Sequence, residues 1–201
     1  MSYLKIRKIK RLYFGYNEVA QISGITKNSA RVACTRMVKK GLLVRLKRDL
    51  YVLEEKWNNM SKEDKFIIAN ILQVPSYVSL MTALDYYGVT TQMQRDFVES
   101  ICIYRTKEIK IKETVFNYTK IKKELYAGFV KENDFFIATK ERAFLDAVYL
   151  FSLGKYNFDL TSIDYGKLDK SVLNEMLKCY PTYTQKRTLE ILKNYEYIRK
   201  T

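Results

Sequence analysis

The stretch "YNEVAQISGITKNSARVACTRMVKKGLLVRLKRDLYVL", residues 16–53, decides how the first quarter of the chain folds. Its first nine residues predict a short helix ending at Gly24, because glycine accepts the left-handed conformation that helix ends often use. Thr26 is a suitable N-cap for a second helix over residues 27–40, which Gly41 stops. Two helices joined by a turn of three or four residues that contains glycine are typical of a helix-turn-helix.

The second predicted helix has two unlike faces when its residues are placed at about 100° intervals. One side is small and apolar, which suits packing on the preceding helix, and carries Ala30, Ala33, Cys34 and Met37. The opposite side offers amide, hydroxyl and guanidinium groups that can reach base edges and phosphates. It carries Asn28, Val32, Thr35 and Lys39, flanked by Arg31 and Arg36. Val32 there suits either contact with a thymine methyl group or an ordinary surface position.

The end of the stretch, "GLLVRLKRDLYVL" over residues 41–53, predicts a β-hairpin with a charged tip. The tip has Asp49 where such hairpins usually have glycine, and aspartate tolerates turn conformations better than most residues. The side of the first strand that anchors the hairpin is expected to carry Leu42, Val44 and Leu46. The other side carries Leu43, Arg45 and Lys47. Helix, turn, helix and hairpin in this order predict a winged helix-turn-helix.

The positive charge of the chain is concentrated in the same region. The whole sequence has a formal net charge of +14, and residues 1–50 contain 13 Lys and Arg against Glu18 and Asp49, so they carry +11 of it. A basic N-terminal module attached to a nearly neutral remainder is typical of a protein that binds nucleic acid. The alternative is a solvated basic surface that has no partner.

Composition narrows the other function classes. The 201 residues allow one large domain or two small ones, and 47% hydrophobic residues support a packed core. Histidine is absent, which removes the commonest general base and metal ligand. Cys34, Cys102 and Cys179 have no metal-binding or redox spacing, so we expect no cofactor and a cytoplasmic location. Neither a membrane span nor a signal peptide is predicted.

Residues 57–201 predict a second domain after a DNA-binding domain over residues 1–56. Runs rich in Phe, Val, Ile, Tyr and Thr predict strands at residues 96–104, 113–121, 125–131 and 134–139. Helices are expected at about residues 61–73, 79–87, 139–153, 171–180 and 184–199. The predicted fold class is α+β: a winged helix-turn-helix, then a mixed α/β domain with a small, mainly antiparallel sheet and C-terminal helices.

Two phrases in the second domain carry a family resemblance. "YVSLMTALDYYGVTTQ" is followed by the predicted strands and then by "IATKERAFLDAVYL". In this order and spacing, the chain resembles the AbiEi-type antitoxins of type IV toxin–antitoxin systems. The first phrase matches the family pattern at Tyr77, Ser79, Ala83, Leu84 and Gly88. The second matches it at Ala138, Thr139, Glu141, Ala143, Leu145 and Asp146. Lys140 follows Thr139 where the family usually has proline, and the last 50 residues contain no matching motif.

The resemblance implies a function for each domain. Similar proteins bind inverted repeats in the double-stranded DNA of their own promoter and repress it. Their C-terminal region counteracts a partner toxin with a nucleotidyltransferase fold, and this protection need not require a tight complex between the two proteins. The antitoxins are not regarded as enzymes. The alternative is a winged-helix regulator whose C-terminal domain senses a ligand or binds a protein, without antitoxin activity.

The candidate DNA-binding residues follow from the expected docking of a winged helix. The helix over residues 27–40 would enter the major groove, and the hairpin tip would reach the backbone or a minor groove. The expected base contacts are Asn28, Arg31, Val32 and Thr35. The expected phosphate contacts are Lys27, Arg36, Lys39, Arg45, Lys47 and Arg48.

An enzyme that acts on nucleic acid is a third hypothesis. Glu141 and Asp146 are the obvious carboxylates, but five residues along a helix separate them by about 140°, too far for a shared metal or an acid–base pair. The sequence also has no glycine-rich phosphate loop, nucleophile elbow or set of metal ligands. We therefore expect no catalytic residues and no metal site.

Overall fold

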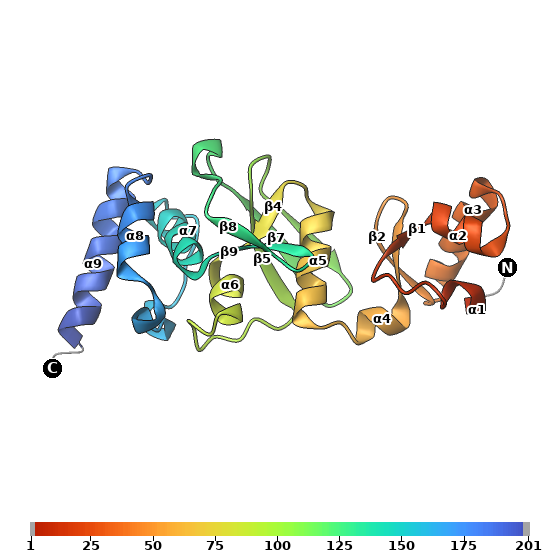
Figure 1. Cartoon of the computed structure of the whole chain (residues 1–201), viewed down its shortest axis with the longest axis horizontal. Helices are drawn as coiled ribbons and strands as arrows, with labels where there is room; N and C mark the ends of the chain where they lie inside the picture. Colours follow the sequence, from red (N-terminus) through yellow and green to blue (C-terminus); the bar gives the residue numbers. More distant parts are fainter. Residues whose placement is uncertain (1–2, 199–201) are drawn as a thin grey trace. The chain divides into compact units, whose positions relative to one another are not determined.

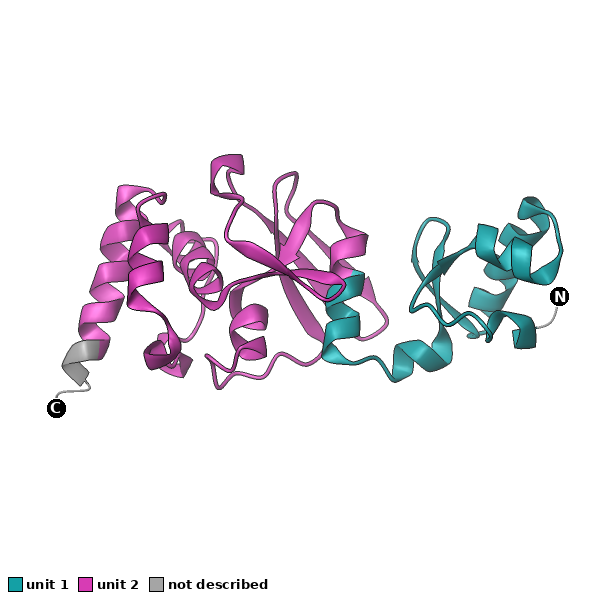
Figure 2. Ribbon diagram, viewed as in Figure 1, with its two compact units in different colours: residues 1–68 teal, residues 69–201 magenta. Residues whose placement is uncertain are grey.

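The computed structural model of the chain describes residues 3–198. The chain divides into an N-terminal unit, up to Ile68, and a C-terminal unit, from Ala69 onward (Figure 2). The division falls within helix α5 (Lys62–Leu72), and the domain boundary expected at residues 56–57 lies within helix α4 (Glu54–Asn58). Both units contain helices and strands, so the fold class is α+β.

The N-terminal unit consists of short elements around a small sheet (Figure 1). Before α4 it contains α1 (Tyr3–Ile6), β1 (Phe14–Gly15), α2 (Tyr16–Ser23), α3 (Lys27–Lys39), β2 (Leu43–Lys47) and β3 (Leu50–Leu53). The three strands are antiparallel, in the order β1-β3-β2. The two predicted helices and the hairpin are confirmed, whereas strand β1 was not predicted.

Local side-chain and backbone signals set the turn between α2 and α3. Gly24 has φ 66°, and its N–H donates to the carbonyls of Ala20 and Gln21, which closes α2. The Thr26 hydroxyl accepts a hydrogen bond from the Ser29 N–H at 3.2 Å, which caps the start of α3. Both signals act as predicted, because each needs only residues within one helical turn.

Asp49 shapes the hairpin turn through its backbone. Its φ is 58°, in the left-handed region that glycine, asparagine and aspartate enter more readily than other residues. A β-carbon placed on Gly15 would lie 3.4 Å from the Asp49 carbonyl oxygen, so β1 passes close beside the turn. Aspartate therefore takes the left-handed turn position where such hairpins usually have glycine.

Leu43 departs from the expected pattern of the hairpin. It was not among the residues expected to anchor the hairpin, but its side chain is 2% exposed and lies in the core of the N-terminal unit. Val44 and Leu46 are buried as well, and a bulge interrupts the register between Arg45 and Lys47. Burial alternates from Val44 to Lys47, with Arg45 and Lys47 exposed, so only Leu43 at the start of β2 departs from period-two alternation.

The basic segment that precedes α2 is anchored to the rest of the N-terminal unit. Ile6 and Ile9 are buried in the same core as Leu43. The Nζ of Lys56 on α4 donates to three successive backbone carbonyls, those of residues 9–11, at 3.0, 2.8 and 2.7 Å. The backbone of this basic segment is thus anchored to the N-terminal unit.

The C-terminal unit consists of a mixed six-stranded sheet and a group of helices (Figure 1). Its strands are β4 (Ser76–Val78), β5 (Phe97–Cys102), β6 (Lys107–Ile111), β7 (Thr114–Lys120), β8 (Phe129–Glu132) and β9 (Phe135–Ala138). Its α-helices after α5 are α6 (Leu80–Tyr86), α7 (Lys140–Ser152), α8 (Lys170–Leu177) and α9 (Thr182–Ile198). Its 3₁₀ helices are η1 (Lys123–Leu125), η2 (Leu160–Ser162) and η3 (Tyr165–Lys167).

The sheet is mixed, and three of its five strand pairs, β4–β5, β6–β7 and β8–β9, are antiparallel. Its strand order is β6-β7-β5-β4-β9-β8, and the pairs β5–β7 and β4–β9 are parallel. Strands β4 and β6 were not predicted. β4 has only three residues, which follow Pro75. β6 has the charged sequence "KEIKI", which is typical of an exposed loop, and it lies at the edge of the sheet.

Helix α7 begins as predicted and becomes the central helix of the unit. The Thr139 hydroxyl accepts a hydrogen bond from the Arg142 N–H at 3.3 Å, and α7 packs against α6, α8 and α9. No described helix combines the length and the apolar composition required to cross a membrane.

Candidate nucleic-acid interface

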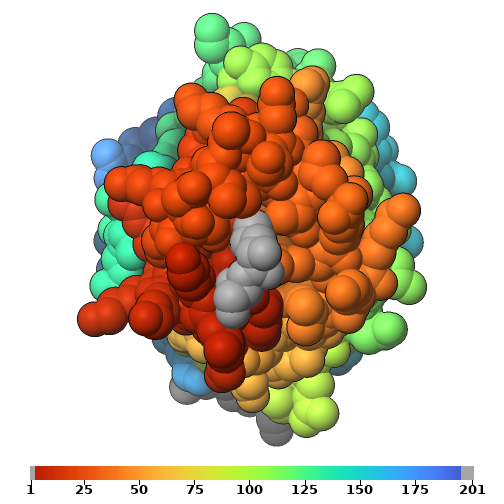
Figure 3. Space-filling view, turned by 90° about the vertical axis from the view of Figure 1, so that its right-hand side faces the viewer, coloured from red at the N-terminus to blue at the C-terminus, as the bar shows by residue number. Residues whose placement is uncertain are grey.

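Helix α3 has one buried face and one exposed face. Ala30, Cys34 and Met37 are buried, as its periodicity predicts, whereas Ala33, expected on the same face, is only partly buried. The candidate contact residues on α3 are all exposed, namely Lys27, Asn28, Arg31, Val32, Thr35, Arg36 and Lys39. The hairpin residues Arg45, Lys47 and Arg48 are exposed too. Figure 3 shows the orange-red side chains of the helices and the orange side chains of the hairpin together on one face of the N-terminal unit.

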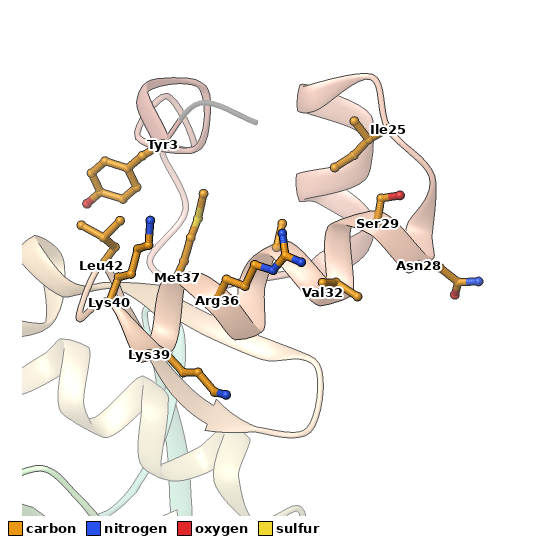
Figure 4. Close-up of a pocket in the computed structure, with 11 residues that line it drawn as sticks. Tyr3, Ile25, Asn28, Ser29, Val32, Arg36, Met37, Lys39, Lys40 and Leu42 are labelled. Carbon is orange, nitrogen blue, oxygen red and sulfur yellow. The ribbon is translucent and has the colours of Figure 1, made fainter.

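A groove of about 990 Å³ runs along the exposed face of α3 (Figure 4). Asn28, Val32 and Arg36 project from successive turns of the helix beside it. Val32 is 51% exposed, so it lies in the middle of the polar face and does not contribute to the core. This placement leaves an apolar contact point between an amide and a guanidinium group.

The groove includes residues that the sequence-based list missed. Ser29 and Lys40 line it, and Tyr3 closes one end together with Leu42. Ser29 lies seven residues from Arg36 and Lys40 lies four residues from it, so helical periodicity could have found both. No local signal points to Tyr3, because only tertiary packing brings α1 to this groove.

Arg31 is held where α2, α3 and the hairpin meet. Its Cζ lies 4.5 Å from the centroid of the Tyr16 ring, and its Nε lies 3.4 Å from Oδ1 of Asp49. Stacking on the ring and pairing with the carboxylate together orient the guanidinium. Because Arg31 and Arg36 are five residues apart, they lie on opposite flanks of the exposed face, about 140° apart. Arg31 therefore belongs to the hairpin side of the surface.

Thr35 has only part of its hydrogen-bonding capacity available to a ligand. Its hydroxyl donates to the Arg31 carbonyl at 3.0 Å, within α3. The hydroxyl oxygen can still accept, which suits an exocyclic amino group of adenine or cytosine in a major groove. Thr35 is thus better placed to accept a hydrogen bond from a base than to donate one.

Cys34 lies on the buried side of α3. Burial raises the pKa of its thiol to about 11, and the nearby Asp49 carboxylate adds to this effect. A buried thiol with a raised pKa is a poor nucleophile at neutral pH. Cys34 is therefore a packing residue behind the exposed face.

Asp146 on α7 is the centre of a buried polar network in the C-terminal unit. It is 0% exposed, and its Oδ1 lies 2.8 Å from Nη2 of Arg142. Its Oδ2 accepts hydrogen bonds from the Tyr77 hydroxyl at 3.0 Å and the Ser79 hydroxyl at 2.8 Å, and Oδ1 accepts one from Tyr180 at 3.2 Å. Each carboxylate oxygen is engaged by the protein, so the network joins β4, α7 and the segment before α9.

The other buried carboxylate on α7 has different partners. Glu141 accepts a hydrogen bond from the Asp169 N–H at 3.0 Å, at the start of α8. None of the contacts of Asp146 are shared with Glu141, which agrees with their predicted separation around the helix. The hydroxyls of Tyr86 and Tyr87 both donate to Glu132, at 2.8 and 2.9 Å. The hydrogen bonds of Glu141 and Glu132 therefore hold parts of the C-terminal unit together.

Glu99 on β5 is a buried carboxyl group without a cationic partner among its determined contacts. Burial raises its pKa to about 7, although the hydrogen bond from the Tyr156 hydroxyl and those from the Met81 and Thr82 backbone lower it. The Tyr156 hydroxyl lies 3.0 Å from Oε2 of Glu99. Since the pKa in the unfolded chain is about 4.5, the folded protein keeps a proton that the unfolded chain releases. The free energy of unfolding should therefore fall as the pH rises from about 4.5 to about 7.

Replacing Glu99 with glutamine should remove this pH-dependent loss of stability. We expect Glu99→Gln to be more stable than the wild type by about 1–3 kcal/mol at pH 8, with the difference shrinking toward pH 5. Urea unfolding at both pH values measures it, with the exposed Glu190→Gln as the control. A variant no more stable than the wild type at pH 8 would contradict the raised pKa.

The described residues contain no group of three or more His, Cys, Asp or Glu side chains that could hold a metal ion. Comparison of the sequence with protein-family models finds no match, and comparison with curated proteins finds none. The arrangement that stands out chemically is the basic, exposed face of α3 and the hairpin.

Proposed function

We propose that the N-terminal unit is a winged helix-turn-helix that binds double-stranded DNA, and that the protein is a transcriptional repressor. The observation that carries the proposal is the exposed face of α3, where the candidate contact residues gather next to a basic hairpin. The order β1, α2, turn, α3, β2 and β3, with the three strands in one antiparallel sheet, is the arrangement expected of a winged helix.

In the proposed complex, α3 enters the major groove along its exposed face. Asn28 and Val32 meet base edges, because they lie in the first turns of the helix and on its outermost side. Lys27, Arg36 and Lys39 contact phosphates on either side, and Arg48 reaches the backbone from the hairpin tip. Arg31 supports the junction of helix and hairpin. It contacts the DNA backbone between these two elements.

The proposed role of the C-terminal unit is antitoxin activity against a nucleotidyltransferase-like toxin in the cytoplasm. The two phrases that resemble the AbiEi-type family meet at one point: Tyr77 and Ser79 from the first phrase donate to Asp146 from the second. A shared buried network gives a physical reason for both phrases to occur in one chain. The network supports the family resemblance only as a packing arrangement. Co-expression with the toxin tests the antitoxin activity itself.

A groove in the C-terminal unit favours the alternative, a regulator whose second domain binds a ligand or a protein segment. The groove measures about 600 Å³, and its apolar lining comes from Tyr165, Leu168, Leu173, Leu189, Leu192 and Tyr195. Co-expression with a nucleotidyltransferase encoded next to this gene separates the two proposals. Restored growth supports an antitoxin, and persistent toxicity supports the alternative.

Two single substitutions test the assignment of contacts. We expect Asn28→Ala to reduce discrimination between the native upstream DNA and a scrambled duplex by about 1–3 kcal/mol, because a base contact is lost.

We expect Arg48→Ala to weaken binding to both duplexes alike and to make the slope of log affinity against log salt shallower by about 0.9. Fluorescence anisotropy across a salt series measures both. The reverse pattern would mean that α3 docks differently.

A further inference from the structure

Asp49 lies in the hairpin turn between two cations of the proposed DNA-binding surface. Its Oδ1 lies 3.4 Å from Nε of Arg31, and its Oδ2 lies 3.7 Å from Nε of Arg48. Arg31 is in the first turns of α3 and Arg48 is at the hairpin tip, so the carboxylate links the two elements that would flank a DNA strand. The Asp49 side chain is 28% exposed, so solvent and a ligand can reach it.

We propose that Asp49 is an internal competitor for DNA phosphate. A carboxylate and a phosphate present similar oxygen atoms to a guanidinium group, so both can occupy the same place beside Arg31 and Arg48. Without DNA, the carboxylate holds that place. A phosphate that enters between α3 and the hairpin must replace it, which lowers the net gain from binding. This inference rests on the proposed DNA-binding function.

The turn itself does not require a negative charge. At φ 58°, asparagine and glycine are as suitable as aspartate. The other acid in residues 1–50, Glu18, accepts the Gly15 N–H at 2.9 Å and pairs with Arg11, so it has a capping role at α2. The charge of Asp49 therefore needs a separate explanation, and its position against two arginines supplies one.

The competitor acts on every DNA sequence to the same extent. The phosphate backbone is the same in the native site and elsewhere, so Asp49 weakens specific and non-specific binding by a similar factor. It thereby keeps a strongly basic surface from holding DNA of any sequence too tightly. Base contacts from Asn28 and Val32, in the middle of the exposed face of α3, decide the choice of site.

The test removes the charge and keeps the turn. We expect Asp49→Asn to bind both the native upstream duplex and a scrambled duplex about 3- to 10-fold more tightly at 0.1 M salt. We expect its salt slope to be steeper by about 0.9, as for one additional phosphate contact. Asp49→Gly should behave likewise, and Glu63→Gln on α5, with the same change in net charge, is the control.

The outcomes separate this inference from the proposed function. If the wild type binds with a salt-dependent affinity and both Asp49 variants bind no more tightly while retaining the wild-type melting temperature, the competitor role is overturned and DNA binding stands. An equal gain in the Glu63→Gln control would also overturn it, since overall charge would then be the cause. If none of the proteins binds either duplex, both ideas fail.

Discussion

Replacing Arg142 with methionine should destabilise the C-terminal unit by about 3–5 kcal/mol. Arg142 is 4% exposed and is the cation that pairs with the fully buried Asp146. Removing it leaves the carboxylate buried with hydroxyl donors only, and also removes the hydrogen bond from Nη2 to the Leu125 carbonyl. An uncompensated buried charge is one of the few defects with so large an effect.

Urea unfolding followed by circular dichroism measures this loss, and fluorescence of the single Trp57 reports on the N-terminal unit separately. Arg187→Met is the matched control. Its ion pair with Glu190 is about half exposed on both sides, and exposed pairs contribute about 1 kcal/mol or less. If Arg142→Met loses no more free energy of unfolding than Arg187→Met, the network around Asp146 is not a principal source of stability.

Neutralising three cations on α3 should have the largest effect on DNA binding. We expect the triple variant Lys27→Gln, Arg36→Gln and Lys39→Gln to make the slope of log affinity against log salt shallower by about 2.7, since each phosphate contact contributes about 0.9. At 0.1 M salt the affinity should fall by about 10²- to 10³-fold for the native and the scrambled duplex alike. Glutamine forms helices well, so α3 should persist.

A second triple variant supplies the control for net charge. Lys120→Gln, Lys122→Gln and Lys123→Gln removes the same charge from exposed positions in the C-terminal unit. This control should bind DNA nearly as the wild type does. Equal losses in the two triple variants would show that binding follows overall charge, and the α3 surface would lose its assignment as the interface.

Local signals were sufficient for the helices, the turn and the hairpin of the N-terminal unit. Gly24 and Thr26 act within a few residues of their own positions, and the spacing of Ala30, Cys34 and Met37 already separates the buried face of α3 from the exposed one. Helical periodicity and capping are short-range effects, so they can be read without knowledge of the fold. The cap at Thr139 was predictable for the same reason.

The roles of Arg31 and Asp49 were beyond such signals. In sequence, Arg31 was one of several candidate base contacts on the polar face of its helix. The pairing with Asp49 and the stacking on Tyr16 arise only when three separate segments meet. The same holds for Leu43, which packs in the core of the N-terminal unit with residues from several separate segments.

In the C-terminal unit, more of the structure depends on tertiary contacts than in the N-terminal unit. Strands β4 and β6 are short or charged, and their partners in the sheet, not their own residues, make them strands. Asp146 was identified in sequence, but its hydrogen bonds come from Tyr77 and Ser79, which are 69 and 67 residues away. Contacts over such separations depend on cooperative packing of the whole unit, and no local pattern encodes which side chains they bring together.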